Sequence, residues 1–210
     1  MTIHLTNVGK KFNRDRIFGR LSHTFQSGNH TVILGSNGSG KSTLLQIIAG
    51  NISPSEGELR YSSNGQTIST ETLFRSLSFA SPYMELLEEL TLSEHISFHG
   101  GLKPFRNGLD VKAVAELSGL ATSLEKQVRF FSSGMKQRLR LTLAILSDTP
   151  LLLLDEPCSN LDQKTVLWYQ DLIKNNSEDR LILVCSNQQE MEYPFCKERL
   201  QMENFNHLSP

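Results

Sequence analysis

The sequence predicts an α/β fold, with a parallel-sheet core, an N-terminal antiparallel β subdomain and an inserted α-helical subdomain. Two short runs, residues 151–154 and 181–184, are apolar without alternation, which is typical of parallel strands buried on both faces. Between about residues 85 and 147 the apolar residues instead recur at helical spacing. A third observation is a glycine-rich loop at residues 35–43, which lies between a strand-like and a helix-like segment.

The composition is that of an ordinary globular domain. At 210 residues the chain can bury a sizeable core, and its 38% hydrophobic and 20% charged residues are typical of such proteins. The formal charge of −1 gives no electrostatic reason for a nucleic-acid partner, and none is expected. We expect a single domain of residues 1–210, with a core formed by residues 1–84 and about 148–210 and a helical insertion at about 85–147.

Several signals bear on the cellular location. The three cysteines are odd in number and unpatterned, which argues against a disulfide scaffold. No apolar run approaches the roughly 18–20 residues that span a bilayer. The amino terminus lacks the basic segment and the apolar stretch of a secretory signal. We therefore expect a cytoplasmic protein.

The first third of the chain is rich in strand signals. Residues 2–8 and 17–25 predict two strands joined by a basic, polar loop, and a turn precedes the next strand. That strand, at residues 31–34, leads into the glycine-rich loop, and a helix follows from about residue 41 to residue 49, where Gly50 ends it. Further strands are predicted at residues 58–62, 67–69 and 76–80.

The remainder of the chain alternates helices and buried strands. Periodic apolar residues predict three helices in the insertion, at residues 92–99, 111–118 and 135–146. After the strand at residues 151–154, the predicted elements are a helix at 162–174, a strand at 181–184 and an edge element at 199–204.

The glycine-rich loop matches the phosphate-binding pattern G-x-x-x-x-G-K-[ST], which predicts a P-loop NTPase core. Glycines let successive backbone N–H groups turn toward a phosphate, and the following helix directs the positive end of its dipole at the same anion. Lys41 can then reach the β- and γ-phosphates, and the Ser42 hydroxyl can bind Mg²⁺. The alternative, a Gly/Ser linker with an incidental lysine, does not explain the flanking strand and helix. The expected nucleotide-binding residues are Gly35, Ser36, Asn37, Gly38, Ser39, Gly40, Lys41, Ser42 and Thr43.

Two acids, Asp155 and Glu156, follow the buried strand at residues 151–154. Ligands of open α/β sheets bind at the carboxyl ends of the strands, so both acids are expected near the phosphate loop. Asp155 suits a role at Mg²⁺, and Glu156 is placed to act as the general base that polarises a water for attack on a γ-phosphate. An ordinary polar turn after a strand is the alternative.

A second helix start with phosphate-binding character lies at residues 131–138. Ser132 resembles an N-cap, and the small residues after it leave backbone N–H groups open to an anion. A helix cap without any ligand is the alternative.

The order of these motifs resembles the ATP-binding cassette (ABC) ATPase domain, and the resemblance covers nearly the whole chain. It comprises the P-loop, a signature-like segment at residues 131–135, the acids after the strand, and a D-loop-like Ser-Asn-Leu-Asp at residues 159–162. The resemblance implies that two cassettes, as a homodimer or heterodimer, hold each ATP between one P-loop and the other signature helix.

The same resemblance assigns roles to residues outside the P-loop. It implies that Ser132, Ser133 and Gly134 face the γ-phosphate bound by the partner, and that Asp162 communicates across the dimer. Phe12 falls where the family usually has an aromatic residue that stacks on adenine. Simple packing of Phe12 in the core is the alternative, because aromatic residues in early strands are commonly buried.

The chain departs from the family pattern in three places. Phe131, Ser133 and Met135 replace the usual Leu, Gly and Gln, and residues 81–84 contain no glutamine. Asn187 stands where the family has its switch histidine. Because Asn can donate a hydrogen bond but cannot carry a proton or charge as His can, we expect ATP and Mg²⁺ binding to be intact and hydrolysis, through Lys41, Glu156 and Asn187, to be slower.

Two other groups of residues have a structural interpretation. His95 and His99 are four residues apart, a spacing that could bind a metal on a helix, but no third ligand is evident and we expect core or surface histidines. Lys136, Arg138 and Arg140 are expected to form a solvated helix face rather than a nucleic-acid patch.

The function implied by the resemblance is an ATP-binding and ATP-hydrolysing subunit of an ABC transporter, of the compact, single-cassette, exporter-like type. It would drive a separate transmembrane permease subunit from the cytoplasmic face of the membrane. The alternatives are a soluble ABC ATPase that is not coupled to transport and a slow or degenerate regulatory cassette. A single cassette without sustained heptads or C-x-x-C argues against the first alternative.

Overall fold

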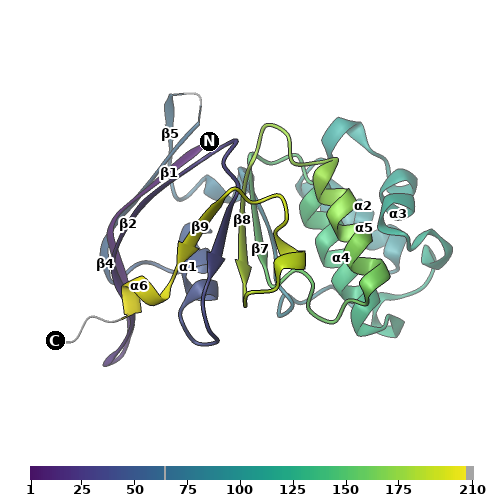
Figure 1. The fold of residues 1–210 in the computed structure, drawn as a ribbon. Coiled ribbons are helices and arrows are strands. Elements are labelled where there is room, and N and C mark those ends of the chain that lie inside the picture. Colours follow the sequence, from purple (N-terminus) through teal and green to yellow (C-terminus); the bar gives the residue numbers. More distant parts are fainter. Residues whose placement is uncertain (64, 207–210) are drawn as a thin grey trace.

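The computed structural model describes residues 1–63 and 65–206, and these residues form layers (Figure 1). An antiparallel sheet lies on one side, a parallel sheet lies in the middle, and a group of helices lies beyond it. The predicted fold class is therefore confirmed. The expected core segment 148–210 extends into residues 207–210, which lie outside the described residues.

The antiparallel sheet is built from the N-terminal part of the chain. Ile3 and Leu5 are buried while His4 and Thr6 are exposed, the alternation expected for a sheet with one face in the core. Its strands, in the order β2-β1-β4-β5, are β1 (Thr2–Phe12), β2 (Asp15–Gln26), β4 (Glu56–Ser63) and β5 (Gln66–Ile68). The first two strands are longer than predicted because they pair as a hairpin as far as its tip.

The parallel sheet forms the centre of the molecule. Its strands, in the order β6-β7-β8-β3-β9, are β3 (Thr31–Leu34), β6 (Leu77–Ala80), β7 (Leu151–Asp155), β8 (Leu181–Ser186) and β9 (Glu198–Gln201). Every residue of β3, β7 and β8 is buried, as their apolar runs predict. The predicted edge element at residues 199–204 is partly wrong, because the chain divides there into β9 and a short helix, α6 (Glu203–Asn206).

Most of the longer helices begin at polar caps, whereas the helix after the glycine-rich loop begins after Gly40 without a side-chain cap. Thr91 and Glu94 form a capping box that satisfies backbone N–H groups at the start of α2 (Leu92–Leu102), and Asp110 caps α3 (Val111–Ser118). The longer helices are α1 (Lys41–Ile48), α2 (Leu92–Leu102), α3 (Val111–Ser118), α4 (Ser133–Leu146) and α5 (Gln163–Lys174). Short 3-10 turns lie at Leu73–Arg75, Arg106–Gly108, Ala121–Ser123, Val128–Phe130 and Glu190–Glu192.

The central sheet separates two apolar cores. Leu152 and Leu154 pack into a core shared with α2 to α5. Leu151 and Leu153 face the other way, into a core that contains α1 and the buried face of the antiparallel sheet. Both faces of β7 are therefore covered, and this arrangement explains its apolar sequence (Figure 1).

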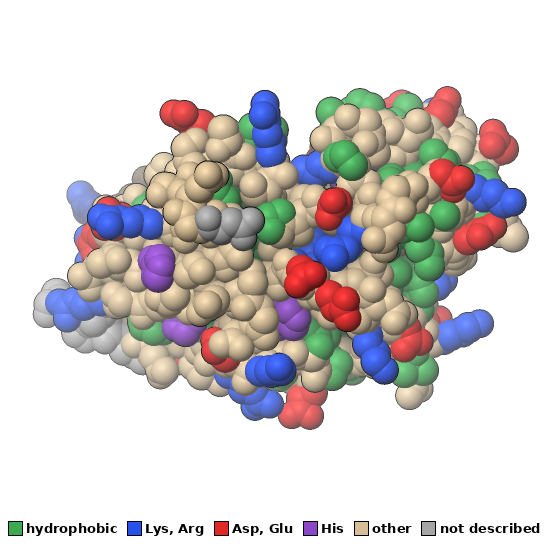
Figure 2. Space-filling model, turned by 90° about the horizontal axis from the view of Figure 1, so that it is seen from above, with side chains coloured by type: hydrophobic (Ala, Val, Ile, Leu, Met, Phe, Trp, Pro, Cys, Tyr) green, Lys and Arg blue, Asp and Glu red, His purple; other side chains and the backbone are tan. Residues whose placement is uncertain are grey.

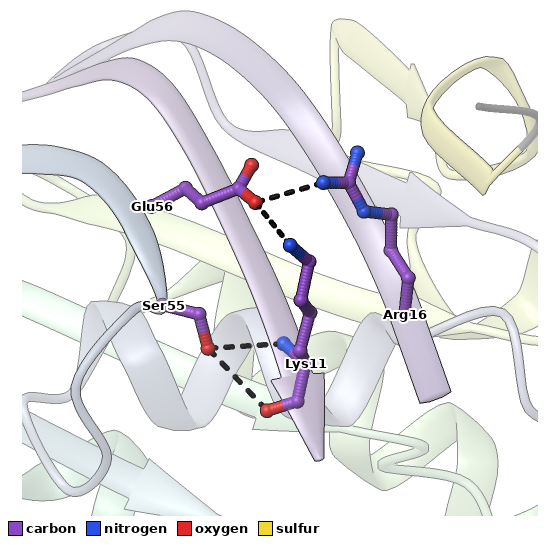
Figure 3. Close-up of polar contacts among 4 residues, drawn as sticks. All are labelled: Lys11, Arg16, Ser55 and Glu56. Carbon is purple, nitrogen blue, oxygen red and sulfur yellow. Dashed lines mark hydrogen bonds and ion pairs between the residues drawn. The ribbon is translucent and has the colours of Figure 1, made fainter. Parts of the chain in front are cut away.

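The tip of the β1–β2 hairpin is fastened to β4 by exposed polar contacts (Figure 3). One Glu56 oxygen accepts from Lys11 Nζ at 2.6 Å and from Arg16 Nη2 at 2.7 Å. The hydrogen bond from Lys11, together with the nearby charge of Arg16, holds the pKa of the Glu56 carboxyl below its usual value. Ser55 Oγ accepts from the Lys11 N–H at 3.0 Å and donates to the Lys11 carbonyl at 3.3 Å. These contacts fix the strand end that carries Phe12.

The surface seen from above carries mixed charges. Basic and acidic side chains are interspersed over this face rather than sorted by sign (Figure 2). Within residues 1–63 and 65–206, none of the helices combines the length and apolarity needed to cross a bilayer.

Candidate functional site

The glycine-rich loop lies between β3 and α1 and borders a hollow of about 490 Å³. Gly38 and Gly40 have φ angles of 82° and 95°, in the region that glycine adopts freely. A Cβ on Gly40 would lie 2.8 Å from Ile17 Cγ2, so the close approach of β2 also requires glycine there. The N-terminus of α1, with its unpaired N–H groups, opens into this hollow.

Lys41 is buried beside the loop. Its ammonium donates to the carbonyl oxygens of Gly35 at 2.8 Å and Ser36 at 3.0 Å. These bonds offset the cost of burying the charge and hold the cation at the edge of the hollow. A phosphate entering the hollow would therefore meet both the cation and the start of α1.

Ser42 and Asp155 come together although they are far apart in the sequence. Ser42 Oγ donates to Asp155 Oδ1 at 3.1 Å. Burial raises the pKa of the Asp155 carboxyl above its ordinary value, and the hydrogen bond from Ser42 opposes that rise. A hydroxyl and a carboxylate oxygen in contact are the hard ligands that Mg²⁺ prefers, so these residues fit the ion.

Glu156 follows β7 and lines the same hollow as Lys41 and Ser42. Its backbone has a φ of 43°, which is uncommon for a residue with a side chain. The Glu156 N–H donates to the Cys185 carbonyl at 3.0 Å, and Ser159 Oγ donates to Glu156 Oε2 at 3.4 Å. The structure therefore holds a carboxylate at the hollow in a fixed, strained turn.

A second, smaller hollow of about 240 Å³ lies at the start of α4. Ser132 caps this helix by accepting from the Met135 N–H at 3.2 Å, as its N-cap character predicts. Ser133 and Gly134 are the first helical residues, two positions earlier than the predicted start. Asp162 lines the same hollow and caps α5, where a hydrogen bond from Thr165 holds the pKa of its carboxyl below its usual value.

The signature-like and D-loop-like segments are thus neighbours, but they lie apart from the phosphate loop. A Cβ on Gly134 would lie 3.6 Å from the Asn160 carbonyl oxygen, so the two segments pack closely. The two hollows share no lining residue. Within one chain, Ser132 and Lys41 therefore belong to separate sites.

Several predicted residues do not line the first hollow: Gly35, Ser36, Ser39, Asp155, Phe12 and Asn187. Ser39 is buried within the loop. Phe12 is 46% exposed at the end of β1, so the alternative that it packs in the core is wrong. Lys10 Nζ lies over its ring at 4.9 Å from the centroid. Asn187 is exposed directly after β8.

The two histidines of α2 make structural contacts. His95 Nε2 accepts from the Leu87 N–H at 3.2 Å. Because Ser147 Oγ already donates to the Leu143 carbonyl, His99 Nε2 carries the proton in its 2.8 Å bond to Ser147 Oγ. Burial lowers the pKa of His99 to about 4, so the ring is neutral at physiological pH.

The basic residues of α4 are half-buried rather than solvated, so that expectation is wrong. Lys136 pairs with Glu88 at 2.5 Å, and Arg140 Nε donates to the Met84 carbonyl at 2.6 Å. The Arg138 guanidinium lies 4.7 Å from the centre of the Trp168 ring. These contacts tie α4 to its surroundings.

Sequence reasoning missed three residues at the first hollow or against the phosphate loop. Ile17 and Tyr83 line it, and Tyr83 is 85% exposed there after β6. Glu203 of α6 accepts from the Ser36 N–H of the loop at 2.7 Å. Tyr83 lies in the segment 81–84, which differs from the family pattern by the lack of a glutamine, whereas Glu203 lies in no motif or periodic pattern.

Comparison with known proteins agrees with this geometry. The family model described as ABC transporter matches residues 18–159. A Bacillus subtilis (strain 168) protein named Uncharacterized ABC transporter ATP-binding protein YybJ is 30% identical over 209 residues, covering 96% of this chain and 93% of that protein. Four further relatives are far longer proteins, of which the chain spans 10 or 11%.

Solved structures share the fold. A putative ABC transporter ATP-binding protein from Pyrococcus furiosus has a TM-score of 0.81 at 18% identity, covering 98% of this chain and 99% of its own. A dimeric, post-hydrolysis ATP-binding cassette, MJ0796, bound to ADP and Pi, has a TM-score of 0.77 at 22% identity and covers 90% of each chain.

Proposed function

Because the chain belongs to the ABC transporter ATP-binding family, we propose that it binds and hydrolyses ATP as a dimer and thereby drives a separate membrane permease. The observation that carries the proposal is the hollow beside the phosphate loop, which gathers Lys41, Ser42 and Glu156, with Asp155 hydrogen-bonded to Ser42. It provides a cation for phosphate oxygens, two oxygen ligands for Mg²⁺ and a carboxylate for a water molecule.

The catalytic step follows from these positions. ATP would lie with its phosphates on the loop amides and Lys41, and Ser42 and Asp155 would hold Mg²⁺, which neutralises phosphate charge. Glu156 would accept a proton from water as its oxygen attacks the γ-phosphorus. The bond from that phosphorus to the bridging oxygen then breaks and ADP leaves. Asn187 would donate a neutral hydrogen bond to the γ-phosphate, so we expect slower turnover than a histidine gives.

The separate hollows support a head-to-tail dimer. Ser132, Ser133 and Gly134 lie at the start of α4 and do not line the hollow of their own phosphate loop, so these N–H groups would meet an anion held by a second cassette. Asp162 lines the same hollow and would contact the other subunit, so that closure of the dimer at one ATP affects the other site. Phe12 is exposed at the hairpin tip, where an adenine ring could stack on it.

An apolar groove supports a permease partner. Its volume is about 390 Å³, and it lies between the edge strand β6, the segment after it, and helices α2 and α4. The exposed Phe74, Met84 and Leu102 line it, with Lys103 and Arg140 among the polar residues. A permease segment seated there would place this chain on the cytoplasmic face of the membrane. We also propose that the insertion between β6 and β7, residues 85–147, forms a helical subdomain beside the core.

Two substitutions test the proposal. Glu156→Gln removes the base, so turnover should fall at least about 100-fold while ATP with Mg²⁺ gathers the protein into a dimer in gel filtration. Lys41→Ala removes the phosphate cation, so ATP affinity should fall at least about tenfold and the protein should stay monomeric with ATP.

Glu190→Gln, an exposed acid outside the hollow, is the matched control and should behave as the native chain. A Glu156→Gln protein that stays monomeric with saturating ATP would contradict the dimer. If the native chain dimerises with ATP but does not turn it over, the regulatory alternative replaces hydrolysis.

A further inference from the structure

A buried carboxylate joins the two loops that would carry the chemistry. Glu192 ends the 3-10 turn Glu190–Glu192, and its side chain is 1% exposed. One loop is the turn after β7 that holds Glu156. The other is the end of β8, where Asn187 follows the last strand residue.

Each carboxylate oxygen of Glu192 accepts from a different loop. Oε1 accepts from the Cys158 N–H at 3.1 Å, two residues after Glu156. Oε2 accepts from the hydroxyl of Ser186, the residue before Asn187. The same hydroxyl accepts from the Gln189 N–H at 3.2 Å, and Tyr169 donates to the Glu192 carbonyl at 2.8 Å. The buried polar groups are therefore engaged with one another.

The position is an unfavourable one for an acid. Burial raises the pKa of Glu192 to about 7, and the nearby charges of Glu156 and Asp155 act in the same direction. Of the ion pairs found in the described part of the chain, none includes Glu192. An apolar residue there would leave the Cys158 N–H and the Ser186 hydroxyl without their acceptor, so the hydrogen bonds to the two loops are what the carboxyl provides.

We propose that Glu192 is a positioning residue for ATP hydrolysis, which fixes the loop of Glu156 and the loop of Asn187 relative to each other. This inference rests on the proposed function of both residues. Glu192 does not line the phosphate hollow, and it would act through the backbone of Cys158 and the hydroxyl of Ser186. A base that must face one water and one phosphorus loses rate steeply when its backbone shifts.

The test compares kinetic constants and amide exchange in the full chain. Glu192→Ala should lower kcat about 10- to 100-fold and leave the KM for ATP within about twofold, because the phosphate loop is untouched. Amide exchange at Cys158 and Gln189 should become faster in the same variant, with or without ATP. Glu192→Gln should recover most of kcat, since its amide oxygen can accept from Cys158 and its N–H can donate to Ser186 Oγ.

Tyr169→Phe is the matched control, because it removes a buried hydrogen bond to the Glu192 carbonyl and spares the carboxylate. Of the two hydrogen bonds to the Glu192 carboxylate, Ser186→Ala removes only the one from Ser186 and keeps the one from Cys158. It is the substitute test if Glu192→Ala does not fold. An unchanged kcat, or an equal loss of kcat in Tyr169→Phe, would overturn the inference. If the native chain shows no ATP turnover, the proposed function is wrong. The amide-exchange measurement would still show whether Glu192 holds both loops.

Discussion

At the scale of single residues, Asn187 stands where the resemblance to ABC ATPases predicts a switch histidine. Its side chain is exposed directly after β8, so it carries little of the folding energy. An asparagine amide donates a hydrogen bond to a phosphate oxygen but stays neutral as charge builds up on the γ-phosphoryl. A histidine at the same place can also carry a proton and its charge.

We therefore predict that Asn187→His raises the steady-state ATP turnover of the chain about three- to tenfold, without a change in melting temperature. The measurement is phosphate release at saturating ATP and Mg²⁺. Gln189→His adds the same ring at an exposed position two residues further on and should leave turnover unchanged. Equal turnover in the native chain and Asn187→His would mean that this position does not reach the γ-phosphate.

The site residues differ in how well the sequence alone predicts them. The contact of Ser42 with Asp155 follows from a phosphate loop and a buried strand that ends in an acid, and both are local patterns. Glu192 and Glu203 are different, because they act through contacts with residues far away in the chain. Their neighbours in the sequence carry no periodic or motif signal. Only the three-dimensional arrangement brings them to the loops.

At the scale of elements, a buried arginine joins the end of α4 to the start of the parallel strands. Arg180 precedes β8 and is fully buried. Its guanidinium donates to the Ile145 carbonyl at 2.7 Å and the Ser147 carbonyl at 3.3 Å, at the negative end of the α4 dipole. It also donates to the hydroxyls of Thr149 and Ser78 at 2.9 and 3.2 Å. Burial lowers the pKa of Arg180 to about 9, so it stays charged at neutral pH.

Arg180→Lys should therefore lower the free energy of unfolding by about 2–4 kcal/mol, because an ammonium cannot reach all four acceptors of the planar guanidinium. Urea unfolding followed by circular dichroism measures this loss. Arg106→Lys is the control, since among the described residues the Arg106 side chain donates one exposed hydrogen bond, to the Glu178 carbonyl, and its loss should stay within about 0.5 kcal/mol. Equal stability of Arg180→Lys and the native chain would contradict this role.

The elements themselves were predictable wherever one local rule governs them. β7 and β8 are buried on both faces, so their apolar runs identify them. The ends of β1 and β2 depend on cross-strand pairing near the hairpin tip, where the sequence is basic and polar, and the prediction stopped short of Phe12. Likewise β9 is a strand because it pairs with β3, a contact that residues 199–204 cannot reveal by themselves.

At the scale of the whole molecule, the phosphate-loop hollow and the apolar groove lie against different sets of elements. The phosphate loop lies at the carboxyl ends of the parallel strands, as expected for open α/β sheets. The apolar groove instead involves the edge strand β6, helix α2 and helix α4. Because α4 also begins at Ser132, one rigid helix connects the second hollow to the groove. Closure of two cassettes on ATP would therefore move the groove as well.

The last prediction concerns this groove as the docking site of the permease. Leu102 is 69% exposed at its edge, so Leu102→Glu would place a charge in an apolar contact and should abolish recovery of a multi-span membrane protein with the tagged chain from detergent extracts. Leu167→Glu is the matched control, because Leu167 is 57% exposed on α5, outside the groove, and its recovery should match the native chain. ATP turnover of both purified variants should stay at the native value, since neither leucine lines the phosphate hollow. Equal recovery with both variants would place the partner on another surface, while loss of turnover in Leu102→Glu would point to a damaged fold instead of a lost contact.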